Sequence, residues 1–235
     1  MITRRTMHTK LTPNHKGFTI LELMIATAIS SGAILLLMFG FLAMSDSYTK
    51  GLTVSQTQNT TRDVINTISQ SIQFGDPTTI SWTIPMVSAQ SASTSGWFCA
   101  DNNIFAYTLG QAVTANSTHT TGNDALIEQT GTCPPPSGTY SANNRPYPGK
   151  SEQELLGPNM SLAAFSVAMG ADNTYLINIH IVFGSSTVLQ GVTQSNGGVL
   201  YYDIGSNQVK CSGQAGQDFC ASSDLQTVVV PRIAN

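Results

Sequence analysis

The feature that most constrains this chain is the apolar run from Phe18 to Met44. Glu22 is the only ionisable side chain within the run, and about 20 apolar residues are enough for a helix that crosses a membrane. A carboxylate inside such a helix is costly, so it is interpreted as functional, with a partner to be identified. We therefore expect a membrane-spanning helix in which Glu22 has a specific role.

The segment before the run is basic and indicates orientation. It contains no acidic residue and four basic ones, namely Arg4, Arg5, Lys10 and Lys16. Because basic residues that flank a span stay on the cytoplasmic side, we expect the N-terminus in the cytoplasm and most of the chain outside. A secretory signal peptide cleaved near Ala43-Met44-Ser45 is an alternative, but its apolar core normally has about 7 to 15 residues and needs no glutamate. A simple membrane anchor is a further alternative.

The start of the run carries a recognisable motif. Gly17-Phe18-Thr19-Ile20-Leu21-Glu22-Leu23 resembles the processing site of type IV prepilins and type II secretion pseudopilins. In that family a dedicated peptidase cuts after the glycine on the cytoplasmic side and methylates the new amino terminus. The resemblance implies cleavage between Gly17 and Phe18, methylation of Phe18 and a role for Glu22 in assembly. It covers the N-terminal segment only.

The chemistry of this motif also favours assembly. Cleavage after Gly17 would create an ammonium group one helical turn from Glu22, close enough to neutralise the carboxylate within a subunit or across to a neighbour. A charge that is unsatisfied in the isolated chain and satisfied in a polymer would provide both driving force and axial register. We expect a heterologous polymer built through the N-terminal helices.

The resemblance also implies partners and locations. The expected partners are other pilin subunits, the prepilin peptidase and methyltransferase, and an inner-membrane assembly platform. The expected location is the inner membrane, as a single-pass protein, followed by an extracellular pilus or a periplasmic pseudopilus. A minor pilin is preferred, and a minor pseudopilin of a type II secretion system is the alternative.

Composition agrees with export and argues against nucleic-acid binding. Only 10% of the 235 residues are charged, compared with about 25% in typical soluble proteins. The whole chain has a formal net charge of −3, and loss of the basic leader would make it more acidic. The remaining basic residues form no patch that could follow a phosphate backbone; they are Lys50, Arg62, Arg145, Lys150, Lys210 and Arg232.

The four cysteines predict disulfides in an oxidising compartment. They are Cys99, Cys133, Cys211 and Cys220. Three connectivities are possible, and we favour Cys99 with Cys133 and Cys211 with Cys220, because the last two enclose a short flexible loop. A metal site is disfavoured, since no CxxC occurs and neither His119 nor His180 lies at a ligand-like spacing from a cysteine.

Helical periodicity continues beyond the apolar run. Between residues 45 and 62 we expect Tyr48, Leu52 and Val54 to be the apolar anchors. A second stripe at helical spacing should dock on a globular domain; it consists of Val64, Ile65, Ile68 and Ile72. Gly75-Asp76-Pro77 should end the helix.

Beyond residue 78 the pattern changes to strands separated by turns. The expected strands are Thr79–Val87, Trp97–Leu109, Ala125–Gln129, Leu162–Ala168, Tyr175–Phe183, Thr187–Val192, Val199–Ile204 and Thr227–Ile233. The sequence therefore predicts a pilin-like α+β fold in which a long N-terminal helix packs on an antiparallel β-sheet head. Its parts are a leader (1–17), a transmembrane and filament-core helix (18–44), an extracytoplasmic amphipathic helix (45–76) and a β-rich head with disulfide-bonded loops (77–235).

Two further patterns bear on the head. Glu154-Leu155-Leu156-Gly157-Pro158-Asn159-Met160, followed by Leu162–Ala168 and Tyr175–Phe183, loosely resembles the late part of W- and J-type minor pilins and pseudopilins. This likeness is the reason for preferring a minor subunit. The segment Gly110–Glu152 is poor in apolar residues and is expected to form long surface loops. This segment and the Cys211–Cys220 loop are the candidate contact surfaces.

No catalytic constellation is convincing, so we expect neither an enzyme nor a cofactor. Ser47-Tyr48-Thr49-Lys50 matches SxxK, but no SDN or KTG accompanies it. Gly149-Lys150-Ser151 lacks the first glycine and the context of a phosphate loop, and neither HExxH nor GxSxG occurs. Asp101-Asn102-Asn103 and Asp172-Asn173 are better explained as turns than as calcium ligands. A membrane-anchored periplasmic binding protein or enzyme remains the alternative from another class, and its N-terminus would stay uncut.

Overall fold

The computed structural model describes residues 17–82, 95–113, 124–135, 140–142, 144, 146, 151–184, 189–190, 192–194, 200–202, 210–211 and 220–232. The chain forms two compact units, Met1–Ser45 and Asp46–Asn235. A single long helix, α1 (Ile20–Phe74), belongs partly to each unit, and the strands found among the described residues lie in the second. The fold is α+β, as the sequence predicts.

The end of α1 is fixed by local backbone contacts. The helix stops at Phe74, directly before Gly75-Asp76-Pro77, and a 3-10 turn, η1 (Pro77–Thr79), follows. The Gly75 N–H donates to the Ser71 carbonyl (3.1 Å), and the Arg232 N–H donates to the Gln73 carbonyl (3.0 Å). A Cβ on Gly75 would lie 2.5 Å from the Ser71 oxygen, so only glycine fits this close turn.

The buried face of α1 matches the face predicted from the sequence only in the last turns of the helix. Residues Val64, Ile65, Ile68 and Ile72 are buried, as expected. The expected anchors Tyr48 and Leu52 are wrong, because their side chains are 66% and 53% exposed. The buried positions in this part of the helix are instead threonines, namely Thr53, Thr57 and Thr61. Periodicity finds a buried face only where that face is apolar.

The larger sheet is an antiparallel meander. Its strands run in the order β1 (Ser81–Trp82), β2 (Ser95–Ala100), β3 (Asn103–Thr108), β4 (Leu126–Thr130) and β5 (Glu152–Glu154). The expected single strand Trp97–Leu109 is wrong, since Ala100 pairs with Asn103 and the chain reverses between them. Asp101 adopts a positive φ of 57° there, a conformation that Asp and Asn tolerate in tight turns.

The second sheet has three antiparallel strands in the order β12 (Ala221–Val229), β7 (Tyr175–Phe183) and β6 (Met160–Met169). A short 3-10 turn, η2 (Ala171–Asn173), joins β6 to β7. In β7 the residues Tyr175, Ile177, Ile179 and Ile181 are buried on one face, as the alternation in the sequence predicts. The last strand begins and ends earlier than the expected Thr227–Ile233, because its polar first half pairs along β7 from Phe183 onward.

Short strand pairs complete the described head. The pairs are β9 (Val192–Gln194) with β10 (Leu200–Tyr202) and β8 (Leu189–Gln190) with β11 (Lys210–Cys211). The expected strand Val199–Ile204 overlaps β10, whereas Thr187–Val192 covers β8 and the first residue of β9. Only Ser81–Trp82 of the expected Thr79–Val87 is a strand, and residues 83–87 lie outside the described residues.

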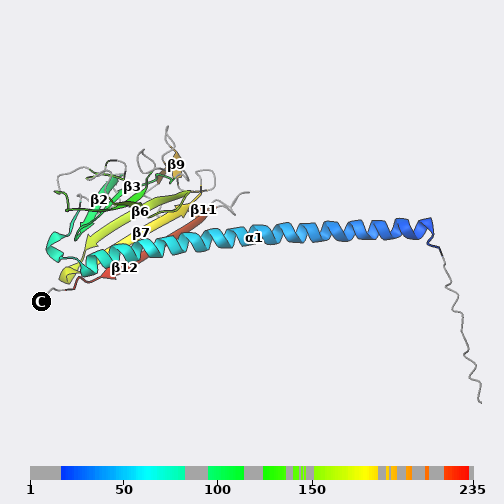
Figure 1. The fold of residues 1–235 in the computed structure, drawn as a ribbon, viewed down its shortest axis with the longest axis horizontal. Helices are drawn as coiled ribbons and strands as arrows, with labels where there is room; N and C mark the ends of the chain where they lie inside the picture. The colour runs from blue at the N-terminus through cyan, green and yellow to red at the C-terminus, as the bar shows by residue number, and fades with distance from the viewer. Residues whose placement is uncertain are drawn as a thin grey trace, which may run out of the picture. The chain divides into compact units, whose positions relative to one another are not determined.

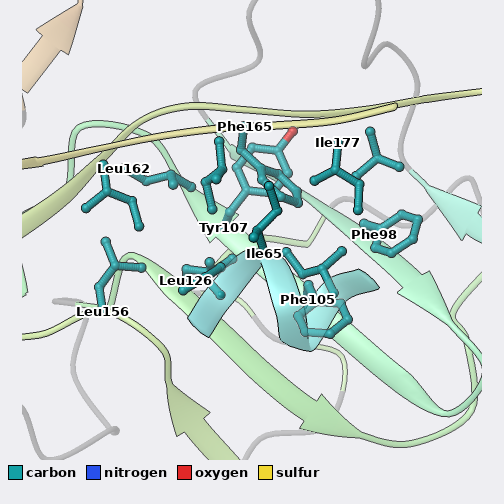
Figure 2. Packing of buried hydrophobic residues seen from close by; sticks show 14 of the residues in the cluster. Ile65, Phe98, Phe105, Tyr107, Leu126, Leu156, Leu162, Phe165 and Ile177 are labelled. Carbon is teal, nitrogen blue, oxygen red and sulfur yellow. The ribbon is translucent and has the colours of Figure 1, made fainter. Parts of the chain in front are cut away.

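One hydrophobic core joins α1 to both larger sheets. The side chain of Ile65 lies among Phe98, Phe105 and Tyr107 from the five-stranded sheet and Phe165 and Ile177 from the three-stranded sheet (Figure 2). In the second unit, the C-terminal turns of α1 therefore lie along these strands (Figure 1). Packing both sheets on the last turns of the helix removes their apolar faces from water.

The outer face of the five-stranded sheet forms a second, smaller core. Trp97, Cys99, Ile104 and Ala106 are fully buried there, with Cys133 and Tyr140 packed against them. Ala142 is buried as well. The expectation that Gly110–Glu152 forms surface loops is therefore wrong for part of this segment. The few apolar side chains in the segment, together with the Cys99–Cys133 bond, cover this face of the sheet.

Candidate functional site

The N-terminal motif folds into a capped helix start. Gly17, Phe18 and Thr19 precede the first turn of α1, which begins at Ile20. The Thr19 N–H and hydroxyl donate to Oε2 of Glu22 at 3.0 and 2.9 Å, and the Glu22 N–H donates to the Thr19 hydroxyl at 3.2 Å. This reciprocal pattern is a capping box, in which the side chains of the N-cap and N3 residues satisfy each other's backbone donors.

The capping box corrects one expectation about Glu22. The carboxylate is not without hydrogen bonds in the uncut chain, because Thr19 supplies two donors. The signal was present in the sequence as Thr19-x-x-Glu22 immediately before an apolar run, which is the capping-box pattern. Within the described residues no cation pairs with Glu22, so its charge, unlike its hydrogen bonding, has no local partner.

The peptide bond between Gly17 and Phe18 is accessible in the structure. Both residues precede the helix, and the Phe18 side chain is 82% exposed. No heavy atom lies within 4 Å of the position that a Cβ on Gly17 would occupy. Nothing in the described part of the chain therefore requires glycine at this position.

The first part of α1 carries the apolar surface expected of a membrane anchor. Described residues 17–45 are all exposed, including Leu36 and Leu37 at 74%. The most apolar 18-residue window of the helix has a mean hydropathy of 2.1. A single N-terminal helix of this length and composition is compatible with a single-pass membrane anchor.

The head contains two disulfide bonds. One joins Cys99 to Cys133, with a Cα–Cα distance of 5.6 Å, and the other joins Cys211 to Cys220, at 5.7 Å. This is the pairing that the sequence analysis favours. The first bond ties the segment after β4 to the C-terminal end of β2, and the second ties β11 to the residue directly before β12.

A partly buried carboxylate in the head was not identified from the sequence. Glu154 on β5 accepts backbone N–H bonds from Ala125 (2.7 Å), Leu126 (3.1 Å) and Leu156 (3.0 Å). Burial raises the pKa of Glu154 to about 7, the three backbone donors oppose this rise, and the nearby Asp124 adds to it. The side chain holds the start of β4 to the segment after β5, so its role in the described structure is architectural.

His180 is a polar residue whose contacts are explained by its place in the sheet. Its Nε2 lies 2.8 Å from the Ser222 hydroxyl on the neighbouring strand, and Asp224 is its direct cross-strand partner. Burial lowers the pKa of His180, with an opposing effect of Asp224. Among the described residues no three His, Cys, Asp or Glu side chains are grouped so that they could hold a metal ion. Ser47 and Lys50 of the SxxK match lie on α1.

Comparison with known protein families, curated proteins and solved structures finds no match to this chain. The case for a function therefore depends on the N-terminal motif and its geometry.

Proposed function

We propose that this chain is a structural subunit of a type IV pilus, most consistent with a minor pilin, that is processed between Gly17 and Phe18 and assembled through its N-terminal helix. The observation that carries the proposal is the motif at the start of α1. The Gly17–Phe18 bond precedes the helix, and Glu22, with which no cation pairs among the described residues, lies in the first turn. No catalytic group is assigned.

The structure supports a specific order of events for this proposal. In the uncut chain Thr19 provides hydrogen bonds to the carboxylate but no charge. Hydrolysis of the Gly17–Phe18 bond leaves the ammonium group of Phe18 one residue before the capping threonine. The new ammonium group and the Glu22 carboxylate would then lie about one helical turn apart, and opposite charges at such a separation attract strongly in a region of low dielectric. Neutralisation within one subunit or between two would then make burial of the helix in a filament less costly.

The mass of the mature N-terminus tests the proposal. The protein is purified from membranes and from sheared filaments of its natural host, and its N-terminal peptide is measured by mass spectrometry. A peptide that begins with methylated Phe18 is expected, and a Gly17→Phe variant should retain the leader. A chain that begins at residue 1, or one released by a cut near Ser45, would contradict the proposal.

A type II secretion pseudopilin would give the same N-terminal mass. The second measurement is therefore the location of the mature chain. A pilus subunit is recovered with extracellular filaments, whereas a pseudopilin stays with the cell envelope and its deletion blocks secretion of folded exoproteins.

A further inference from the structure

Burial of α1 begins at Thr53, and up to residue 61 the buried side chains of the helix are all threonines. Thr53, Thr57 and Thr61 recur every four residues, which places them on one helix face, and they are 8%, 0% and 0% exposed. Their hydroxyls donate to the carbonyls four residues earlier, at 3.0, 2.9 and 2.7 Å. Each of these three hydroxyls therefore donates within the helix.

The next turns of the helix are held differently. Val64, Ile65, Ile68 and Ile72 are at most 7% exposed and belong to the main hydrophobic core. Full burial of one such side chain contributes about 1.5–3 kcal/mol. In the preceding stretch Leu52 is 53% exposed and Val54 is half-buried, so most of the apolar contribution to docking comes from the last three turns of α1.

The helix is also intrinsically weaker where the threonines lie. Gly51 lies inside α1, and no heavy atom lies within 4 Å of the position its Cβ would take, so close packing does not explain this glycine. Glycine costs about 1 kcal/mol relative to alanine in a helix interior. Threonine has a low helix propensity, and its hydrogen bond to the carbonyl at i−4 loosens the helix.

We propose that residues 46–61 of α1 open from the head as one unit while residues 64–74 stay docked. Segments with few buried apolar contacts open at a lower free energy than the core of a protein, and this boundary separates such a segment from the core. In terms of the filament function proposed above, the opening lets the helix change direction while the head remains folded.

Hydrogen exchange on the full chain in lipid nanodiscs tests the proposal. Amides of residues 20–44 should be protected by lipid and those of residues 64–74 by the head. Amides of residues 46–61 should exchange at least about tenfold faster than those of residues 64–74. Equal protection on both sides of residue 62 would overturn the proposal. The measurement uses unassembled protein, so its result is independent of whether the chain forms filaments.

Isosteric substitutions provide a matched comparison. Thr57→Val with Thr61→Val replaces two buried hydroxyls by methyl groups and should slow the exchange of residues 46–61 by about tenfold, toward that of the docked turns. Thr67→Val is the control, because Thr67 makes the same type of hydrogen bond, to the Asp63 carbonyl at 2.9 Å, outside the opening segment. If the double variant exchanges as fast as the control in residues 46–61, the proposal is wrong. The single Thr61→Val variant gives the same comparison if the double variant folds poorly.

Discussion

At the residue scale, Glu22 combines a hydrogen-bonding role and a charge, and substitutions can separate the two. Glu22→Gln keeps an oxygen that can accept from Thr19 but removes the charge, whereas Glu22→Leu removes both. Thr19→Val keeps the charge and removes the capping hydroxyl, a loss of about 1 kcal/mol of helix stability. If the charge drives assembly, both Glu22 variants should be cleaved normally but be absent from filaments, and Thr19→Val should still assemble.

Immunoblots of sheared filaments and of membranes measure this prediction, with the N-terminal mass as a control for processing. Normal incorporation of Glu22→Leu would contradict a role of the carboxylate in register. Assembly of Glu22→Gln together with failure of Thr19→Val would assign the function of this pair to the capping box instead.

Glu154 makes the stability of the head depend on pH. Its pKa rises from an ordinary value of 4.5 to about 7 on folding, so the folded state binds this proton more tightly than the unfolded state. The resulting contribution is fully present below about pH 4.5 and is lost as the pH rises through about 7. Relative to Glu154→Gln, the wild-type head should lose up to about 3 kcal/mol of unfolding free energy across this range.

Denaturant unfolding at pH 4.5, 6 and 7.5 measures the difference between these two proteins. Burial also lowers the pKa of His180, but this residue is present in both proteins, so its contribution cancels in the comparison. A constant difference across the three pH values would show that folding does not raise the pKa of the Glu154 carboxyl.

At the scale of elements, the amount of structure that could be predicted depends on whether packing follows an apolar pattern. The end of α1 could be predicted because Gly75 and Pro77 act locally. The threonine face of α1 could not, because its burial is imposed by the head rather than by hydrophobicity. The turn at Asp101-Asn102-Asn103 was predicted and the chain does reverse there, but the two stretches that flank it were assigned to a single strand. Both strands of the β2–β3 hairpin are apolar, so their pattern alone did not separate them.

Substitutions on the buried face and on the exposed face of α1 are expected to change the free energy of unfolding by very different amounts. Ile68 is fully buried in the core, whereas Leu52 is 53% exposed. Ile68→Ala removes buried methyl groups and leaves a cavity, so it should cost about 2–5 kcal/mol of unfolding free energy. Leu52→Ala should change it by less than about 0.5 kcal/mol in the unassembled chain. Thermal unfolding of the detergent-solubilised chain compares the two, and equal losses would contradict the observed docking face.

At the scale of the whole molecule, the class of the fold was predictable, but the topology of the head was not. The alternation in β7 and the cysteine spacing are local signals, and the structure agrees with both. The order β12-β7-β6 and the burial of Ala142 depend on contacts between segments far apart in the sequence. Composition and periodicity do not encode such long-range pairing.

The two disulfides stabilise the head to different extents. Cys99 and Cys133 are 34 residues apart in sequence, whereas Cys211 and Cys220 are 9 apart. In the chain-entropy model the longer loop loses more freedom in the unfolded state, which predicts a contribution of roughly 4 kcal/mol for the first bond and roughly 3 kcal/mol for the second. Because Cys99 and Cys133 also pack with Trp97 in the outer core, the Cys99→Ser, Cys133→Ser pair should add a packing loss to the entropic one. In denaturant unfolding, the Cys99→Ser, Cys133→Ser variant should therefore have a lower free energy of unfolding than the Cys211→Ser, Cys220→Ser variant. The reverse order would mean that the segment carrying Cys133 contributes little to covering the five-stranded sheet.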